Sequence, residues 1–264
     1  WKTINPPRLD GLLCNAGALT WEPRFTSEKL EQTLAAQLVF GCYYLTTKLA
    51  LPVMERTSEL ESEVKGVGEA ARCCTNNVVP RAVFVSSGGM YNTKWPGFGK
   101  IVVKPEDVET TASANSRVEK FDGQMQYAYA KRGQVILAEE LAKGTPSSSA
   151  AAENSGNKGS AFQTGAVRVV SCHPGWADTP GVREAYGSSA ALLEPMRTPW
   201  EGAKGICWLL AAAGSEIDSG AFYLDCAPQD KHLDGFLSSS SHTENTPKEV
   251  RSFLRSLEKM ATAL

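Results

Sequence analysis

Short apolar runs alternate with long amphipathic stretches along this chain. Runs of strand length lie within residues 9–19, 81–90, 166–181 and 219–226. Each run is nearly continuous in apolar residues, and small or polar turn residues stand at its end or just beyond it. This pattern is typical of strands that are buried on both faces of a sheet. The chain is therefore predicted to contain four buried strands.

Two long segments with helical spacing lie between the first three strands. Residues 26–56 open with Thr, Ser and Glu28, and their apolar positions keep a helical period as far as Pro52. Residues 125–144 are rich in strong helix formers and stop at Gly144. Both segments are predicted to be long helices.

Two further helices are predicted nearer the C-terminus. Residues 199–214 carry Pro and Trp near the expected first turn, and residues 246–264 begin with Thr246 as a cap and Pro247 in the first turn. Strands that alternate with helices predict right-handed crossovers and a parallel sheet. The predicted fold class is α/β, a Rossmann-like doubly wound parallel sheet with helices on both faces.

The chain length and two polar segments shape the expected domain organisation. The 264 residues suit one α/β domain, residues 1–264, with enough material for a large core. Residues 57–80 are polar and weakly patterned, and are expected to form a surface insert with at most a short helix. Residues 144–165 are dominated by Ser, Ala, Gly and Asn, the composition of a mobile insert. Residues 91–123 are predicted to be a loop.

Charge and hydropathy exclude two classes of partner. With 27 Lys and Arg against 29 Asp and Glu, the chain has no basic excess for a nucleic acid backbone. The most apolar window, residues 34–54, contains Gln37 and Lys48 and is predicted to be too polar for a transmembrane segment. The first residue is Trp1, so we expect the chain to begin partway through a longer one, with any targeting signal out of sight.

The cysteine pattern argues against a disulfide framework and against a metal site. The seven cysteines are odd in number, are scattered and include no Cys-x-x-Cys pair, and there are only three histidines. We therefore expect no bound metal, a reducing compartment and a cytoplasmic location. The vicinal pair is interpreted as incidental. The cysteines are Cys14, Cys42, Cys73, Cys74, Cys172, Cys207 and Cys226.

Small polar turns follow three of the predicted strands. They are Asn15-Ala16-Gly17, Ser86-Ser87-Gly88-Gly89 and Pro174-Gly175. Ligands of parallel sheets bind beyond the carboxyl ends of the strands, so these turns are expected to line one edge. Each turn alone is also explained by ordinary turn chemistry. Their joint order is what suggests a site.

A tyrosine and a lysine open the second long helix near the same edge. Tyr127 and Lys131 stand four positions apart, so they share a helix face. A neighbouring cation favours phenolate, and Lys131 is therefore expected to lower the pKa of Tyr127 and to help it exchange a proton. A solvated helix face is the plain alternative for two common residues at a common spacing. Tyr129 faces elsewhere and is expected to pack.

The four motifs, in this order, resemble the short-chain dehydrogenase/reductase superfamily. The order is Asn-Ala-Gly, Ser-Ser, Tyr-x-x-x-Lys and Pro-Gly-x-x-x-Thr. The resemblance implies that Tyr127 donates or removes the substrate proton and that Ser87 holds the substrate oxygen. It also implies that Lys131 lowers the pKa of Tyr127 and binds the ribose hydroxyls of a nicotinamide cofactor. The implied cofactor is NAD(P), with NADP slightly favoured.

The same resemblance implies further residues beside the cofactor. Backbone of the Asn15-Ala16-Gly17 turn would pack next to it, and the turn after the third strand would border the nicotinamide. His173 is interpreted as structural rather than as a general base. The implied cofactor-binding residues are Asn15, Ala16, Gly17, Tyr127, Lys131, Pro174, Gly175, Ala177 and Thr179.

Two departures from the family pattern bear on these expectations. No Gly-x-x-x-Gly-x-Gly stretch precedes Asn15, so the N-terminal cofactor-binding part is absent, on the order of 80 residues if each strand–helix unit takes 30 or more. The expected fold is then half of a doubly wound sheet with an exposed apolar edge and poor solubility. The family's relay Asn stands three residues before a Gly. Counting back from Gly41 reaches Leu38, with Gln37 beside it.

Two function classes remain after this reasoning. The first is an oxidoreductase that interconverts a small-molecule alcohol and a carbonyl. The alternative is a catalytically silent Rossmann-like binding or scaffold protein. A serine hydrolase is set aside because Ser87 lacks a Gly-x-Ser-x-Gly elbow. The loop after Thr179 is expected to set specificity, with a lipophilic substrate as the guess. Oligomeric state is open, a homo-oligomer included.

Overall fold

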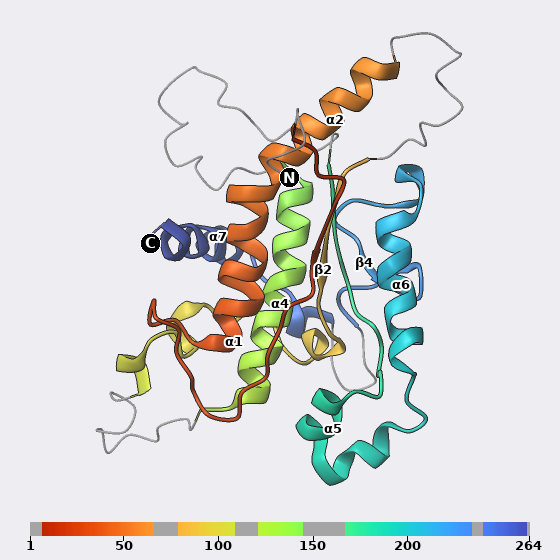
Figure 1. Cartoon of the computed structure of the whole chain (residues 1–264). Coiled ribbons are helices and arrows are strands. Elements are labelled where there is room, and N and C mark those ends of the chain that lie inside the picture. The colour runs from red at the N-terminus through yellow and green to blue at the C-terminus, as the bar shows by residue number, and fades with distance from the viewer. Residues whose placement is uncertain (1–6, 66–78, 109–120, 145–166, 234–239, 263–264) are drawn as a thin grey trace.

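The computed structural model describes residues 7–65, 79–108, 121–144, 167–233 and 240–262 (Figure 1). Most of the predicted insert at 57–80 and nearly all of the one at 144–165 lie outside the described residues. Cys73 and Cys74 lie outside them as well.

A five-stranded sheet forms the centre of the described structure, with the order β1-β2-β3-β4-β5. The first four strands are parallel, as predicted, while β5 is antiparallel to β4 and was not predicted. The last strand expected from the sequence lies within residues 219–226, whereas β4 and β5 together form a tight hairpin. The strands are β1 (Gly11–Cys14), β2 (Arg81–Val85), β3 (Arg168–Cys172), β4 (Phe222–Leu224) and β5 (Ala227–Gln229).

Helices cover both faces of this sheet, which confirms the predicted Rossmann-like α/β class. Figure 1 shows α1 (Gln32–Leu34), α2 (Leu51–Lys65) and α4 (Gly123–Ala142) on one side of the sheet, to its left in this view, and α6 (Pro199–Ala211) on the other side. Strand β2 explains why both faces need cover, because all five of its residues are buried. Ala82 and Phe84 join the core under α4, while Val83 and Val85 join the core under α6. This alternation follows from the two-residue period of a strand.

Strand β1 lies at one end of the strand order. Its only strand partner among the described residues is β2. The Leu13 side chain on this strand is 39% exposed, which is unusual for a large apolar residue in a sheet. The expectation of an exposed apolar edge fits this geometry. Poor solubility of these 264 residues stays a prediction.

The first long helix is longer than predicted and begins later. It runs through α1 (Gln32–Leu34), the π-helical η1 (Ala35–Ala50) and α2 (Leu51–Lys65). Its cap is Glu31, a fully buried residue whose carboxylate accepts the N–H groups of Thr33 and Leu34, both at 2.9 Å. Residues 26–30 therefore lie before the helix. A buried carboxylate tied to two N–H groups gives a stronger cap than a hydroxyl.

This helix also has the length and composition of a membrane span, judged over Gln32–Glu61. In the described structure, however, 56% of its apolar window is buried inside the protein. Leu34, Leu38 and Val39 are fully buried in the core beside α4. The apolar face is thus used for packing against the sheet and its neighbouring helices.

Helix α4 (Gly123–Ala142) carries Tyr127 and Lys131 and is held firmly at its N-terminus. Asp122 caps it by accepting the N–H groups of Gln124 and Met125. Gly144, with φ of 71°, follows its end, as predicted. The other helices are α5 (Pro180–Tyr186), α6 (Pro199–Ala211) and α7 (Pro247–Thr262), with short η3 (Gly88–Asn92), η4 (Phe98–Lys100), η6 (Gly187–Leu193), η7 (Gly214–Glu216) and η8 (Ser240–Thr243).

Helices α6 and α7 both begin with a reciprocal cap. The one at Thr246 was predicted and is confirmed, while the one at Thr198 was not predicted. Thr198 caps α6 through a reciprocal pair with Glu201, with Pro199 as the first helical residue. Thr246 does the same for α7, since its hydroxyl accepts the N–H of Glu249 and the Glu249 carboxylate accepts the N–H of Thr246. Such reciprocal pairs satisfy two of the N–H groups that a helix start leaves unpaired.

Gly123→Ala is expected to lower the free energy of unfolding by about 2–3 kcal/mol, the cost of overpacking a close contact. A Cβ at this position would lie 1.9 Å from the carbonyl oxygen of Thr20, so the loop that follows β1 would have to move. Urea unfolding measures the effect. Gly99→Ala is the control, because a Cβ there meets no atom within 4 Å. Equal stability of the two variants would contradict the prediction.

Candidate active site

The turns after β1, β2 and β3 meet the start of α4 around one cavity of about 380 Å³. Ser87, Tyr127 and Lys131 all line it, together with Asn15 and Gly175. The cavity lies beyond the carboxyl ends of the parallel strands, where this type of sheet binds ligands. Residues that are distant in sequence are thus brought together because three neighbouring strands end at the same edge.

Ser87 and Tyr127 face each other across Gly89. A Cβ at Gly89 would lie 3.6 Å from the Ser87 hydroxyl oxygen and 4.0 Å from a ring carbon of Tyr127. Ser87 also caps η3 by accepting the N–H of Gly89 at 3.1 Å. The serine is therefore oriented by the short turn that follows β2.

Burial raises the pKa of Tyr127, and the hydrogen bond to Ser87 only partly opposes this effect. The expectation that Lys131 lowers this pKa is not what the structure shows. Desolvation of the phenolate outweighs the available stabilisation. Tyr127 is therefore a neutral phenol at neutral pH, which suits a proton donor.

Lys131 is almost completely buried, with 4% of its surface exposed. Its ammonium donates to the carbonyl oxygen of Val85 at 2.8 Å and lies 5.2 Å from the centre of the Tyr127 ring. Burial lowers its pKa from 10.5 to about 8. The hydroxyl of the neighbouring Ser86 donates to the Lys131 carbonyl oxygen at 2.8 Å, which ties the helix to the end of β2.

The structure places eight of the nine expected cofactor-binding residues in the lining of this cavity. Ala16 is the exception and is exposed outside the lining. It stands between Asn15 and Gly17, which both line the cavity, and successive residues of an extended turn point in opposite directions. The eight are Asn15, Gly17, Tyr127, Lys131, Pro174, Gly175, Ala177 and Thr179.

Gln37, rather than Leu38, lines the cavity. Its amide nitrogen donates to the carbonyl oxygen of Ala18 at 2.6 Å, while its amide oxygen is buried and has no hydrogen-bond partner within the described part of the chain. Leu38 is fully buried and packs against Gly133, where a Cβ would lie 2.7 Å from the leucine. The three-residue count back from Gly41, taken from the family's sequence pattern, therefore did not identify the residue that reaches the cavity from this π-helical segment.

His173 has a structural place beside the cavity, which agrees with its interpretation from the sequence. Its Nδ1 accepts the N–H of Gly175 at 3.2 Å, and its ring stacks on Phe222 with centroids 5.2 Å apart. Burial lowers the pKa of His173, so the ring is neutral at neutral pH.

Sequence reasoning missed most of the outer wall of the cavity. Trp176 and Tyr186 line it and contact each other edge to face, with ring centroids 5.3 Å apart. The apolar and aromatic composition of the loop after Thr179 was the available signal, but it did not single out residues. Ser86 and Gly89 line the cavity as parts of the turn that was expected at this edge, and the lining residues that were not singled out are Ala18, Leu19, Val85, Asn92, Gln124, Ala128, Trp176, Gly181, Val182, Ala185 and Tyr186.

A search of the described residues finds no group of three or more His, Cys, Asp or Glu side chains that could hold a metal ion. Among the described residues that line the cavity, Lys131 is the one with a charged side chain. The chemistry of this cavity therefore depends on hydroxyl, amide and ammonium groups.

Comparison with known proteins identifies relatives over nearly the whole chain. The chain is 32% identical over 267 residues to human dehydrogenase/reductase SDR family member 12, covering 99% of this chain and 65% of the relative. It is 31% identical to the Bos taurus protein of the same name, covering 96% of this chain and 62% of the relative. The chain thus spans somewhat less than two thirds of these relatives' length. No family model matches the chain.

Solved structures with a similar arrangement have low sequence identity. The 3-alpha-hydroxysteroid dehydrogenase from Pseudomonas sp. B-0831, complexed with NADH, is 18% identical with a TM-score of 0.45, covering 83% of this chain and 71% of that one. The KRED1-Pglu enzyme is 16% identical with a TM-score of 0.46, covering 82% and 68% of the two chains. The chain is thus similar in sequence, over nearly its whole length, to two proteins named dehydrogenase/reductase SDR family member 12.

Proposed function

We propose that this chain carries the catalytic groups of a nicotinamide-dependent oxidoreductase that interconverts an alcohol and a carbonyl. The observation that carries the proposal is the convergence of Ser87, Tyr127 and Lys131 on one cavity. Packing alone does not require that three such side chains, which come from two elements far apart in the sequence, meet at one cavity. Because the chain spans 65% of its human relative, the proposal concerns the activity of the natural full-length protein.

The residues of the cavity fit the nicotinamide and ribose end of such a cofactor. Asn15 and Lys131 offer hydrogen-bond donors, and the unpartnered amide oxygen of Gln37 offers an acceptor. A buried polar atom without a partner is costly, so a ligand or water that donates to Gln37 would relieve this cost. The cofactor would supply or accept the hydride. NAD and NADP are not distinguished by these residues.

Tyr127 is assigned the proton transfer and Ser87 the substrate oxygen. In the reducing direction a neutral phenol must donate its proton to the carbonyl oxygen, and burial keeps Tyr127 protonated. Lys131 places a positive charge near the ring, which would stabilise the phenolate left after transfer. This arrangement favours carbonyl reduction at neutral pH, with oxidation gaining as the pH rises.

The substrate proposed for this site is an uncharged, apolar carbonyl compound. Trp176, Val182 and Tyr186 form much of the outer wall, and none of them carries a charge. A carboxylate or phosphate on the substrate would find only Lys131, which is buried and already donates to Val85. An apolar wall with few polar groups is the common form of a small-molecule site.

One observation favours the catalytically silent alternative. The Lys131 ammonium donates to the Val85 carbonyl oxygen. The ammonium lies 5.2 Å from the centre of the Tyr127 ring, and no hydrogen bond among the described residues joins it to the Tyr127 hydroxyl. A binding or scaffold protein would need the fold but not the proton transfer. Loss of turnover in a Tyr127→Phe variant would exclude this alternative.

The natural full-length protein is expected to bind NADH or NADPH. The measurement is energy transfer from tryptophan to the bound cofactor, since the chain has six tryptophans. Binding by either cofactor would be followed by a screen of apolar ketones and aldehydes, with cofactor oxidation recorded at its absorbance band. Failure to bind both cofactors would overturn the proposed oxidoreductase and favour the silent alternative.

A further inference from the structure

We propose that Arg197 is a positioning residue that holds one wall of the candidate active site, the segment 174–178, in place through an ion pair with Asp225. The importance of this wall for ligands rests on the proposed function. The placement of the wall by Arg197 rests on contacts alone. Neither residue lines the cavity described above.

The main chain of Arg197 closes an excursion that begins at this wall. Its N–H donates to the carbonyl oxygen of Trp176 at 2.8 Å, and its carbonyl oxygen accepts the N–H of Asp178 at 2.7 Å. These two bonds form a parallel bridge between Ala177 and Arg197. The chain therefore leaves this wall at Asp178 and returns to it at Arg197.

The excursion itself has little packing to hold it. It contains α5 and η6, and Ala190 is the single buried residue within the fully described range 178–197. Yet Thr179, Val182 and Tyr186 of this excursion line the cavity. Their position must then depend strongly on the place where the excursion is closed. That place is Arg197.

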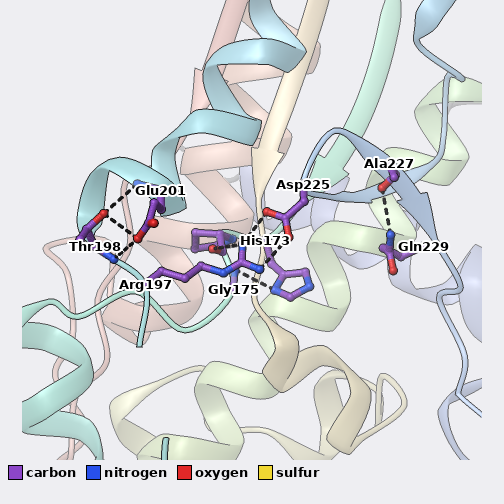
Figure 2. A network of polar contacts seen from close by, with 9 residues as sticks. His173, Gly175, Arg197, Thr198, Glu201, Asp225, Ala227 and Gln229 are labelled. Carbon is purple, nitrogen blue, oxygen red and sulfur yellow. Dashed lines mark hydrogen bonds and ion pairs between the residues drawn. The ribbon is translucent and has the colours of Figure 1, made fainter. Parts of the chain in front are cut away.

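The side chain of Arg197 joins this wall to the sheet. Figure 2 shows it extending toward Asp225 beside His173 and Gly175. The guanidinium donates to both carboxylate oxygens of Asp225, at 2.5 and 2.6 Å, and to the carbonyl oxygen of Pro174 at 3.3 Å. A bidentate pair fixes direction as well as distance. Arg197 thus contacts the wall from one side while His173 accepts the N–H of Gly175.

Gly175 leaves the space that this arrangement needs. Its φ is 74°, and a Cβ there would lie 2.7 Å from the Nε atom of Arg197. The guanidinium therefore packs directly on the backbone of the turn. A side chain at this position would force the arginine away from Asp225.

Asp225 is itself held in an uncommon conformation. Asp225 and Cys226 form the two-residue loop between β4 and β5, with φ of 51° and 64°. Neither residue is glycine, so this left-handed conformation is less favourable for each of them than an ordinary one. The hairpin nevertheless presents the carboxylate to Arg197. A carboxylate held in the tight turn of a sheet hairpin is a firm anchor for an otherwise loosely packed excursion.

This pair is suited to positioning rather than to global stability. The side chains of Arg197 and Asp225 are 32% and 56% exposed, and exposed ion pairs contribute little to the free energy of unfolding. Breaking it should leave the fold intact while loosening the wall. Local and global effects can therefore be separated by experiment.

The first test is hydrogen exchange followed by mass spectrometry on the purified chain. Arg197→Gln is expected to speed exchange about tenfold in peptides from residues 174–186 and to leave α4 and β2 unchanged. Arg183→Gln is the matched control, because Arg183 makes a similar bidentate pair with Asp178 on the same excursion. Unchanged exchange in Arg197→Gln, or equal effects in both variants, would overturn the proposal.

The second test is a double-mutant cycle with Asp225→Asn. If the two residues act as one pair, Arg197→Gln and Asp225→Asn produce similar local exchange and the double variant adds little. In full-length protein that binds NADH or NADPH, each single variant is expected to raise the cofactor Kd about tenfold with little change in Tm. Strictly additive effects would show that the residues act separately and would overturn the pairing.

The outcomes for this proposal and for the proposed function differ. Suppose that Arg197→Gln speeds hydrogen exchange in residues 174–186 but the full-length protein binds neither cofactor. This result supports the role of Arg197 and counts only against the oxidoreductase. Normal cofactor binding with unchanged exchange and unchanged Kd in Arg197→Gln counts only against the role of Arg197.

Discussion

Tyr127→Phe is expected to lower the turnover number for carbonyl reduction by about 10²–10⁴-fold, the usual contribution of a positioned proton donor. The phenylalanine ring keeps the shape of the tyrosine and removes only the hydroxyl. Because burial keeps Tyr127 protonated at neutral pH, the wild-type hydroxyl is in the form that the reduction needs. The measurement is steady-state reduction of an apolar ketone by full-length protein.

Tyr129→Phe is the matched control for this prediction. Tyr129 lies on the same helix two positions along and packs at the edge of the main core, away from the cavity lining. Its loss of a hydroxyl should change turnover by less than about twofold, as expected of a residue outside the reaction. Cofactor Kd and Tm of both variants should match wild type within error. Equal turnover of wild type and Tyr127→Phe would remove the proton-transfer role.

The charged form of Lys131 is expected to cost about 3 kcal/mol of stability at neutral pH, because its pKa falls from 10.5 to about 8 on folding. Between pH 8 and 10.5 the unfolded chain keeps this proton while the folded chain has lost it. The free energy of unfolding therefore rises with pH across this window. Below pH 8 both states are protonated and the full cost remains.

Comparison with Lys131→Met isolates this effect from other groups that titrate in the same window. The stability of wild type relative to Lys131→Met should rise by about 3 kcal/mol between pH 8 and 10.5, as measured by urea unfolding. Lys143→Met is the control, since Lys143 lies at the exposed end of the same helix. A stability difference that stays flat across the window would show that Lys131 keeps its charge in the folded protein.

These two predictions describe one trade-off at the site. A fully buried ammonium with a single carbonyl partner is an unfavourable core residue. This unfavourable burial has a function if the positive charge stabilises a bound ligand or the phenolate that forms when Tyr127 gives up its proton. Lys131→Met removes this buried charge. We therefore expect the variant to have a higher free energy of unfolding than wild type at neutral pH and to lose turnover at the same time.

Local sequence pattern was sufficient for the order of elements and for several of their ends. The caps at Thr198 and Thr246 depend on residues three positions apart, so they can be recognised without tertiary contacts. The cap at Glu31 could not, because its carboxylate also accepts from Thr20 and Gln126. A glutamate is an uncommon cap, and the hydrogen bonds from these distant partners offset the desolvation cost of burying its carboxylate.

The hairpin of β4 and β5 was also beyond local pattern. Two-residue hairpin turns can usually be predicted because they contain Asn-Gly or another glycine, but here the turn is Asp225-Cys226. The ion pair with Arg197 helps to explain why such a turn is tolerated. Its partner lies 28 residues away in the sequence, so no local signal predicts it.

By itself, the sequence determined that buried strands alternate with helices, and that the turns Asn15-Ala16-Gly17, Ser86-Ser87 and Pro174-Gly175 share an edge with Tyr127. That follows because strand and helix periods and turn residues are short-range properties. Tertiary structure alone decided that Gln37 rather than Leu38 reaches the cavity, and that Lys131 is desolvated rather than paired with the Tyr127 hydroxyl. Burial depends on which segments pack together, and desolvation energies of several kcal/mol exceed what any local spacing encodes.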